Sequence, residues 1–282
     1  MVIPVLLRGD LKFFIAANAG VNDGAVLRIA HTASSENVTA GDLGADLGGS
    51  LSGGLGAAGS VGSELGGGLE GVAAAWALGQ RGITDVIVCE RDTVGGGMTG
   101  KSSGIVRCHY GVGSLAAMAA VGLEVFEKAE EIFGSDIGFR QTGYVVGVGE
   151  PNVENMRKSL AAQRAVGVQT EEIDAADVAA MWPTADLEPF AAFGWEERGG
   201  YGDAYQTAQA FAASARAAGV RIKQGTSVSG LLTDGERVIG VELADHSTIS
   251  ADTVVVATGV WTKPFLDTYG IDVPITVHRE QI

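Results

Sequence analysis

Three glycines and one acidic residue have the spacing of a turn that binds a dinucleotide. Gly66, Gly68 and Gly71 follow the pattern G-x-G-x-x-G, and Glu90 stands nineteen residues after the last of them. Such glycines allow a tight turn and let backbone N–H groups approach a pyrophosphate at the start of a helix, while the acid can accept hydrogen bonds from a ribose. Because the chain contains 43 glycines, the pattern needs support from the elements around it.

The segments around these glycines supply most of a strand–turn–helix–strand unit. Apolar residues recur at helical spacing from Leu69 to Ala77, Gly82 ends the helix, and residues 85–90 have the composition of a buried parallel strand. The segment before Gly66 is rich in glycine and serine instead. The sequence therefore predicts the helix and the second strand, whereas the first strand lacks its apolar body.

A second glycine-rich loop, residues 95–102, matches the phosphate-loop pattern G-x-x-x-x-G-K-S and raises the alternative of a nucleotide triphosphatase. In a true phosphate loop a strand leads directly into the loop, and the loop leads directly into a helix. Here residues 91–94 separate the strand from the loop, and residues 103–111 have poor helical character. The sequence therefore disfavours a triphosphatase.

The composition excludes several classes of partner and site. With 19 Lys and Arg against 34 Asp and Glu, the net charge of −15 disfavours binding to nucleic acid or to an anionic membrane. No stretch approaches ~18 uninterrupted apolar residues, so we expect no membrane span. Arg8, Asp10 and Lys12 interrupt the apolar N-terminus before a secretory signal could form, so we expect a cytoplasmic location. Two cysteines suggest neither a disulfide framework nor a thiolate metal site, and the four histidines are too scattered to bind a metal.

The order of elements predicts an α/β fold: a Rossmann-like FAD/NAD(P)-binding sheet domain with an inserted α+β substrate domain. Residues 1–60 carry no periodic signal and include a glycine-rich stretch, so we expect a flexible or non-homologous segment. The predicted helices are 114–134, 152–166 and 204–218, and the predicted strands are 141–148, 190–195, 228–232, 238–243, 248–251 and 253–257. The sheet domain is assigned to 61–136 and 200–272, and the substrate domain to 137–199 and 273–282.

With these residues assembled, the chain resembles the flavin-dependent amine oxidoreductases of the sarcosine oxidase and D-amino-acid oxidase superfamily, in particular sarcosine oxidase β-subunit-like members. Four segments carry the resemblance, and their order and spacing are more specific than any one of them. They are 66–71 with Glu90 and Arg91, 95–107, 198–203, and 256–261. The resemblance spans residues 65–282.

The resemblance implies a noncovalent FAD, with its ribose on Glu90 and its pyrophosphate over Gly66, Gly68 and Gly71. Covalent attachment is not expected, because no histidine follows Gly199 and Gly200 where relatives that bind a second, covalent flavin carry one. The remaining cofactor-binding residues expected from the resemblance are Arg91, Gly97, Thr99, Lys101, Ser102, Ser103, Val228, Thr258, Gly259 and Trp261.

Arg107 is the substrate-binding candidate, because related enzymes hold the substrate carboxylate with an arginine at this place and a planar guanidinium suits a carboxylate. The implied reaction is oxidation of the C–N bond of a secondary or N-methylated amino acid, such as sarcosine, by hydride transfer to the flavin. Family members continue beyond the position of Ile282 with more of the substrate domain. An inactive or partner-dependent fragment is therefore one alternative, and an NAD-dependent dehydrogenase is another because Glu90 suits NAD as well.

Overall fold

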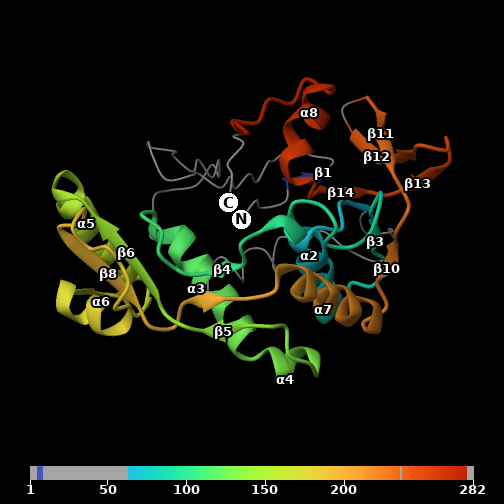
Figure 1. Cartoon of the computed structure of the whole chain (residues 1–282). Coiled ribbons are helices and arrows are strands. Elements are labelled where there is room, and N and C mark those ends of the chain that lie inside the picture. The colour runs from blue at the N-terminus through green and yellow to red at the C-terminus, as the bar shows by residue number, and fades with distance from the viewer. Residues whose placement is uncertain (1–4, 9–62, 236, 278–282) are drawn as a thin grey trace. The chain divides into compact units, whose positions relative to one another are not determined.

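The computed structural model describes residues 5–8, 63–235 and 237–277, and these residues divide into two compact units. Unit 1 comprises residues 63–103 and 204–277 together with Val5–Arg8, and unit 2 comprises residues 104–203. Figure 1 shows the elements of each unit. Apart from Val5–Arg8, which forms strand β1, the segment predicted to be flexible or non-homologous lies outside the described residues.

The centre of unit 1 is a five-stranded sheet with the order β1-β14-β2-β3-β10. Strands β14 (Thr253–Val256), β2 (Ser63–Leu65), β3 (Ile87–Cys89) and β10 (Arg221–Lys223) are parallel to their neighbours, and β1 runs antiparallel along β14. Val88, Val254 and Val256 are fully buried, as expected for a parallel sheet that is covered on both faces.

Two helices of unit 1 lie side by side, α2 (Leu69–Gln80) and α7 (Ala204–Ala217) (Figure 1). The ring of Trp76 on α2 packs edge-on against the ring of Phe211 on α7, with the two ring centroids 5.2 Å apart. Small residues allow this close approach, because a Cβ at Gly79 would lie only 2.9 Å from the Cβ of Ala218. These contacts pack the second half of α2 against α7.

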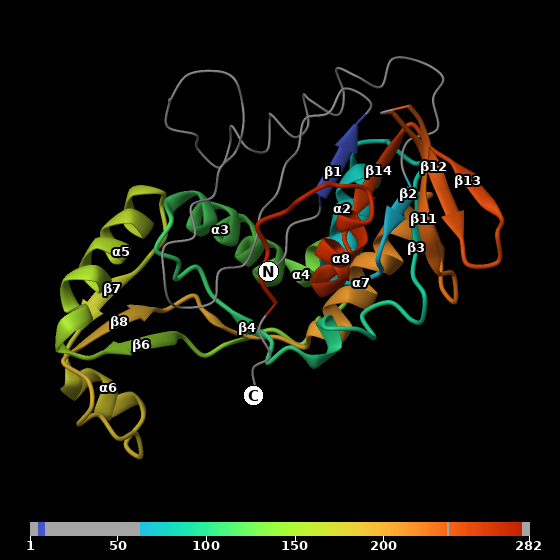
Figure 2. The same cartoon turned by 90° about the horizontal axis from the view of Figure 1, so that it is seen from above.

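A three-stranded antiparallel meander completes unit 1. It consists of β11 (Val228–Asp234), β12 (Arg237–Leu243) and β13 (Thr248–Ser250) (Figure 2). Its buried residues, including Val241 and Leu243, join Val254, Val256 and Leu266 in one apolar cluster. Leu266 comes from α8 (Thr262–Asp267), which follows β14 after the short 3-10 turn η3 (Gly259–Trp261).

Unit 2 contains two three-stranded sheets. The first has the order β4-β9-β5 and consists of Ile105–Val106, Gly200–Tyr201 and Arg140–Gln141. The second has the order β6-β8-β7 and consists of Tyr144–Val148, Ala192–Glu196 and Glu171–Ile173. The helices are α3 (Gly113–Glu127), α4 (Ala129–Phe133), α5 (Val153–Ala165) and α6 (Ala175–Met181), with the 3-10 turn η2 (Glu150–Asn152) before α5.

The structure corrects the prediction for the first strand. Ser63–Leu65 forms a strand although its composition is poor, because β14 pairs with it on one side and β3 on the other. Backbone hydrogen bonds to the two neighbouring strands therefore hold this segment in the sheet although its sequence is poor in apolar residues. One smaller correction concerns a helix: the helix predicted at 114–134 is broken into α3 and α4. Asn152 caps α5 as predicted, and the turn η2 precedes that helix.

The glycine-rich loop at residues 95–102 does not have the geometry of a phosphate loop. It ends in the single 3-10 turn η1 (Thr99–Lys101), and the chain then enters strand β4 rather than a helix. This agrees with the prediction that disfavours a nucleotide triphosphatase.

Candidate functional site

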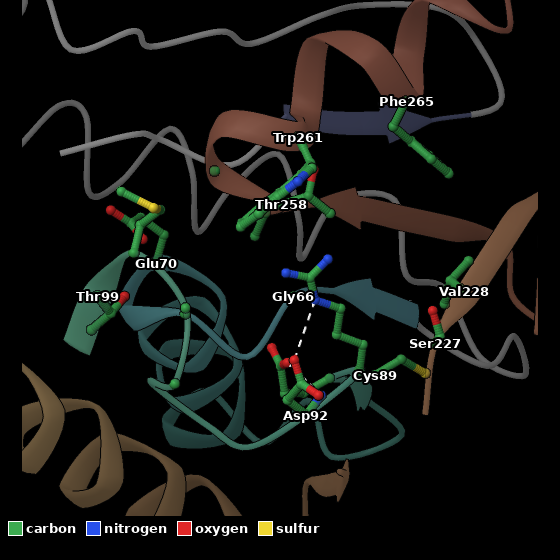
Figure 3. Close-up of a pocket in the computed structure, with 18 of the residues that line it drawn as sticks. Gly66, Glu70, Cys89, Asp92, Thr99, Ser227, Val228, Thr258, Trp261 and Phe265 are labelled. Atoms are coloured by element: carbon green, nitrogen blue, oxygen red, sulfur yellow. Dashed lines mark hydrogen bonds and ion pairs between the residues drawn. The ribbon is translucent and has the colours of Figure 1, made fainter. Parts of the chain in front are cut away.

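A cavity of about 430 Å³ lies in unit 1 at the carboxyl ends of the parallel strands β2, β3 and β14. This is the edge at which open α/β sheets bind ligands, and the volume lies in the range of small-molecule sites. Of the residues predicted to bind cofactor, it is lined by Gly66, Gly68, Glu90, Arg91, Gly97, Thr99, Lys101, Val228, Thr258, Gly259 and Trp261 (Figure 3).

Three predicted cofactor residues do not line the cavity. Gly71 is buried in α2, where a Cβ would overlap the carbonyl oxygen of Gly66, so its role here is close packing of the helix against the turn. Ser102 and Ser103 are exposed and follow η1. The structure therefore brings together most, but not all, of the predicted residues.

The lining also contains residues that sequence reasoning missed. They are Cys89, Asp92, Thr226, Ser227 and Phe265, whereas Glu70, Gly96, Met98 and Ala257 lie within segments that carry the family resemblance. Most of the missed residues stand next to a predicted residue in the chain, so proximity in sequence to those residues could have identified them. Phe265 stands four residues after Trp261, where no helix was predicted and the structure forms α8.

Two glycines of the turn before α2 have different roles. Gly66 has a φ of +112°, which L side chains rarely adopt, and a Cβ there would lie 2.5 Å from the carbonyl oxygen of Ala257. Gly68 is the N-cap of α2 and offers no side chain to the first N–H groups of the helix. The start of the helix therefore presents backbone donors and the positive end of the helix dipole at the cavity.

The carboxylate of Glu90 joins the glycine turn to the end of β3. Its Oε2 accepts a hydrogen bond from the N–H of Gly67 at 2.8 Å, and its Oε1 accepts one from the N–H of Asp92, also at 2.8 Å. Each carboxylate oxygen has two lone pairs, so both can accept a further donor such as a ribose hydroxyl. Glu90 thus fixes the turn and remains able to bind a nucleoside.

The loop after β3 is attached to the same turn. The hydroxyl oxygen of Thr99 accepts a hydrogen bond from the N–H of Leu69 at 3.0 Å, and the N–H of Gly95 donates to the carbonyl of Gly67 at 2.9 Å. Thr99 therefore satisfies one of the free N–H groups of α2 that the N-cap glycine cannot. The loop is held over the start of the helix by contacts 30 residues apart in sequence.

Arg91 and Trp261 form a pair at the cavity. The guanidinium carbon of Arg91 lies 4.4 Å from the ring centroid of Trp261, which is the geometry of a cation–π interaction. Arg91 also forms an exposed ion pair with Asp92, at 3.5 Å (Figure 3). A cationic group is therefore kept beside the cavity by an aromatic ring that is itself 43% exposed.

These features fit a dinucleotide. The glycine turn leaves space for a pyrophosphate, because nothing larger than hydrogen projects from Gly66 and Gly68. The first N–H groups of α2 and the side chains of Arg91 and Lys101 suit its charge, and Glu90 suits a ribose.

A second group of functional side chains lies in unit 2, immediately after β4. The guanidinium of Arg107 lies over the rings of Tyr110 and Tyr144, 4.7 and 5.3 Å from their centroids, and it donates a hydrogen bond to the carbonyl of His109. Among the residues that the structure describes, Arg107 forms no ion pair. Aromatic rings therefore hold the guanidinium in place without neutralising its charge.

Three titratable groups lie near Arg107: the half-buried His109 and the buried Glu196 and Cys108. Burial, and then the charge of Arg107, lower the pKa of His109 from 6.5 to about 4, so the imidazole is neutral at pH 7. Glu196 is 1% exposed, and burial raises the pKa of its carboxyl, while the hydrogen bonds from Cys108 and the charges of Arg107 and Arg198 oppose that rise. Burial and the adjacent Glu196 raise the pKa of the Cys108 thiol to about 12, which keeps it protonated and unreactive.

The described residues hold no candidate metal site and no candidate membrane-spanning helix. No group of three or more His, Cys, Asp or Glu residues is arranged to hold a metal ion. No helix in the described part of the chain is long and apolar enough to cross a membrane.

Comparison with known proteins identifies the family. The profile of the family described as "FAD dependent oxidoreductase" matches residues 65–282. The chain belongs to this family. The predicted recognition, fold class and FAD cofactor are thereby confirmed, and the NAD-dependent alternative is not supported.

Curated relatives carry names that refer to N-methylated substrates. The chain is 28% identical over 208 residues to "4-methylaminobutanoate oxidase (formaldehyde-forming)" of Paenarthrobacter nicotinovorans, which covers 73% of this chain and 25% of the relative. It is 29% identical over 219 residues to "Sarcosine oxidase subunit beta" of an Arthrobacter species, with 75% and 54% covered. The chain therefore spans about a quarter to a half of the length of these relatives.

A solved structure with a similar fold is L-proline dehydrogenase from P. horikoshii. It superposes with a TM-score of 0.70 at 26% identity, and the match covers 77% of this chain and 57% of that one. Family and fold thus agree with the α/β architecture described above.

Proposed function

We propose that the whole protein oxidises the C–N bond of a secondary or N-methylated amino acid, and that unit 1 binds FAD noncovalently while unit 2 contributes to the substrate site. The observation that carries the proposal is a half-buried arginine, Arg107, whose charge is held by two tyrosine rings and is not neutralised by an ion pair among the described residues. Family membership and the names of the curated relatives support the same conclusion.

Unit 1 provides the groups that would hold the cofactor. Gly66, Gly68 and the first N–H groups of α2 would face the pyrophosphate, Glu90 would accept from the ribose, and Arg91 and Lys101 would balance phosphate charge. When bound, FAD supplies the acceptor for a hydride from the carbon next to the substrate nitrogen.

Arg107 would bind and orient the substrate through its carboxylate. A guanidinium can donate two parallel hydrogen bonds to a carboxylate, which fixes its direction as well as its position. The neutral His109 beside it adds no positive charge, so a protonated substrate amine is not repelled by the imidazole. The amine must lose its proton before hydride leaves the adjacent carbon, so the rate should rise with pH.

The first test is a visible absorption spectrum of the purified, desalted protein, followed by precipitation with acid. A flavin spectrum whose chromophore stays in solution after precipitation is the expected result for noncovalent FAD. Turnover of N-methylglycine should then be compared with that of N-methylethylamine, which lacks the carboxylate. Protein that stays colourless after addition of FAD would contradict the assignment of unit 1, and equal turnover of the two amines would contradict the role of Arg107.

A partner-dependent enzyme is the second candidate. The observation in its favour is that one relative is named as a subunit, "Sarcosine oxidase subunit beta". In that case the chain would bind FAD but turn over N-methylglycine only when its partner is present, which separates this candidate from the first.

A further inference from the structure

A buried glutamate accepts a hydrogen bond from the backbone beside Arg107. Both carboxylate oxygens of Glu196, at the end of β8, accept a hydrogen bond from the N–H of Cys108, at 2.8 and 2.9 Å. The two residues are 88 positions apart in the sequence, so this contact joins β8 to the segment that follows β4. The N–H belongs to the peptide between Arg107 and Cys108, so Glu196 fixes the plane from which the arginine side chain departs.

The use of a carboxylate at this place needs a reason. Burying a charged carboxylate is costly, and a single N–H could be satisfied by a neutral carbonyl or amide oxygen. No ion pair of Glu196 is found within the described parts of the chain, although the charges of Arg107 and Arg198 act on it. The thiol of Cys108 hydrogen-bonds the same carboxylate, so its two oxygens serve two donors of the residue that follows Arg107.

Tyr144 connects the same strand pair to Arg107 from the other side. Tyr144 and Glu196 are directly paired in the β6–β8 ladder, so their side chains project from the same face of the sheet. The ring of Tyr144 lies under the guanidinium of Arg107 and 6.2 Å from the ring of His109. One pair of residues in the sheet therefore contacts both the backbone and the side chain of the arginine.

The segment around Arg107 is anchored at a second point. The amide nitrogen of Gln163, a fully buried residue of α5, donates to the carbonyl of Tyr110 at 3.2 Å. The N–H of Tyr110 in turn donates to the carbonyl of Cys108 at 2.8 Å. The four residues from Arg107 to Tyr110 are thus tied to the sheet at one end and to a helix at the other.

We propose that the Tyr144–Glu196 pair is a positioning element for Arg107: Glu196 fixes its backbone and Tyr144 fixes its guanidinium in the orientation that binds a carboxylate. This inference rests on the proposed function of Arg107. Neither residue is assigned contact with the substrate, so both act through the arginine. A rigidly held guanidinium loses less freedom when it binds, which raises affinity without a new contact.

The backbone part of the proposal is tested by hydrogen exchange at the Cys108 amide, which requires neither turnover nor FAD. Glu196→Ala removes the acceptor, and exchange should become about tenfold faster, the effect of losing one hydrogen bond. Glu196→Gln keeps one acceptor oxygen and should stay within about threefold of the wild type, since the bond is retained. Glu172→Ala, at an exposed glutamate of β7 in the same sheet, is the control and should leave this amide unchanged. An unchanged Cys108 amide in Glu196→Ala would overturn the proposal.

The functional part is tested by carboxylate affinity in the holoenzyme. Two quantities are measured. The first is KM for N-methylglycine, and the second is the Kd for acetate, which calorimetry gives without turnover. Glu196→Ala and Tyr144→Leu should raise both, with kcat changed less, whereas Glu196→Gln and Tyr144→Phe should restore them. If Glu196→Ala fails to fold, comparison of the carboxylate affinities of Tyr144→Leu and Tyr144→Phe still tests whether the Tyr144 ring positions Arg107. Wild-type affinity in both Glu196→Ala and Tyr144→Leu would overturn the proposal.

A double-mutant comparison separates failure of this inference from failure of the proposed function. In an Arg107→Ala background, Glu196→Ala should cause no further loss of affinity, because it acts only through the arginine. A second loss of the same size as in the wild type would overturn the positioning role. An Arg107→Ala variant with wild-type affinity for both carboxylates would instead refute the proposed function of Arg107, and the exchange of the Cys108 amide would still report on the contact itself.

Discussion

Replacing single glycines in the turn before α2 should separate cofactor binding from folding. Gly68 is the N-cap of α2, and its backbone angles, φ −68° and ψ 175°, are open to alanine. A Cβ there would lie 3.3 Å from the hydroxyl oxygen of Thr99 and 3.7 Å from a carboxylate oxygen of Glu70. Both are side-chain atoms that can shift by a few tenths of an ångström. Alanine at Gly68 should therefore be tolerated by the fold while it occupies space in the cavity.

Gly71 provides the contrast within the same turn. A Cβ at Gly71 would overlap the carbonyl oxygen of Gly66 and lie 3.2 Å from its carbon. These are backbone atoms of Gly66, whose φ is already +112°. The overlap can therefore be removed only by moving α2 away from β2. Overpacking of this kind costs about 1–3 kcal/mol of unfolding free energy.

Two assays compare the loss of stability with the loss of FAD affinity in these variants. Gly68→Ala should lose at most about 1 kcal/mol of stability, the range of an N-cap change. It should weaken FAD binding by about 5- to 150-fold, the equivalent of 1–3 kcal/mol of crowding. Gly71→Ala should lose stability first, with a lower Tm of the apoprotein. Fluorescence titration of FAD into apoprotein gives the affinity, and thermal unfolding gives the stability. Wild-type FAD affinity in Gly68→Ala, or a wild-type Tm in Gly71→Ala, would refute the account of this turn.

Three further predictions concern other residues. Arg107→Ala should raise KM for N-methylglycine about 10- to 100-fold through loss of charged hydrogen bonds while FAD content stays constant, and steady-state kinetics on both amines checks this. Thr99→Val should remove the acceptor for the N–H of Leu69 and lower the free energy of unfolding by about 1 kcal/mol, as measured by urea denaturation. His109 has a folded pKa of about 4 against 6.5 for the free side chain, so the unfolded chain takes up the proton first. Stability should therefore fall as the pH drops from about 6.5 to about 4, and urea titrations of wild type and His109→Gln should show that the variant loses this slope.

The sequence could predict the glycine turn because its requirements are local. Three glycines, a helical apolar pattern and a buried strand ending at Glu90 are all visible within residues 66–90. The structure places Glu90 against the N–H of Gly67, which is the type of contact that the spacing indicates. The first strand could not be predicted in the same way, because Ser63–Leu65 is a strand through its pairing with β14, almost 200 residues later in the chain.

The contacts around Arg107 were harder to predict from the sequence than the glycine turn. The pattern predicted a strand at 190–195 and so ended it one residue before Glu196, which occupies a buried position at the end of β8. Its hydrogen-bond partner is Cys108, through the N–H and the thiol, and neither group indicates in the sequence a glutamate 88 positions away. Tyr144 was likewise only one residue of a predicted alternating strand. Their joint contact with Arg107 depends on the register of β6 with β8, which a single sequence does not reveal.

The two sites use glutamate in the same way, and this has a consequence for a chain with a net charge of −15. Glu90 and Glu196 each accept hydrogen bonds from backbone N–H groups of a distant segment, 23 and 88 positions away. Glu196, engaged in this way, fixes the backbone beside Arg107 without forming an ion pair with its guanidinium. Its positive charge is held by aromatic rings instead. An acidic protein can therefore keep a local cation available for an anionic ligand, provided that the carboxylates around it have backbone partners of their own.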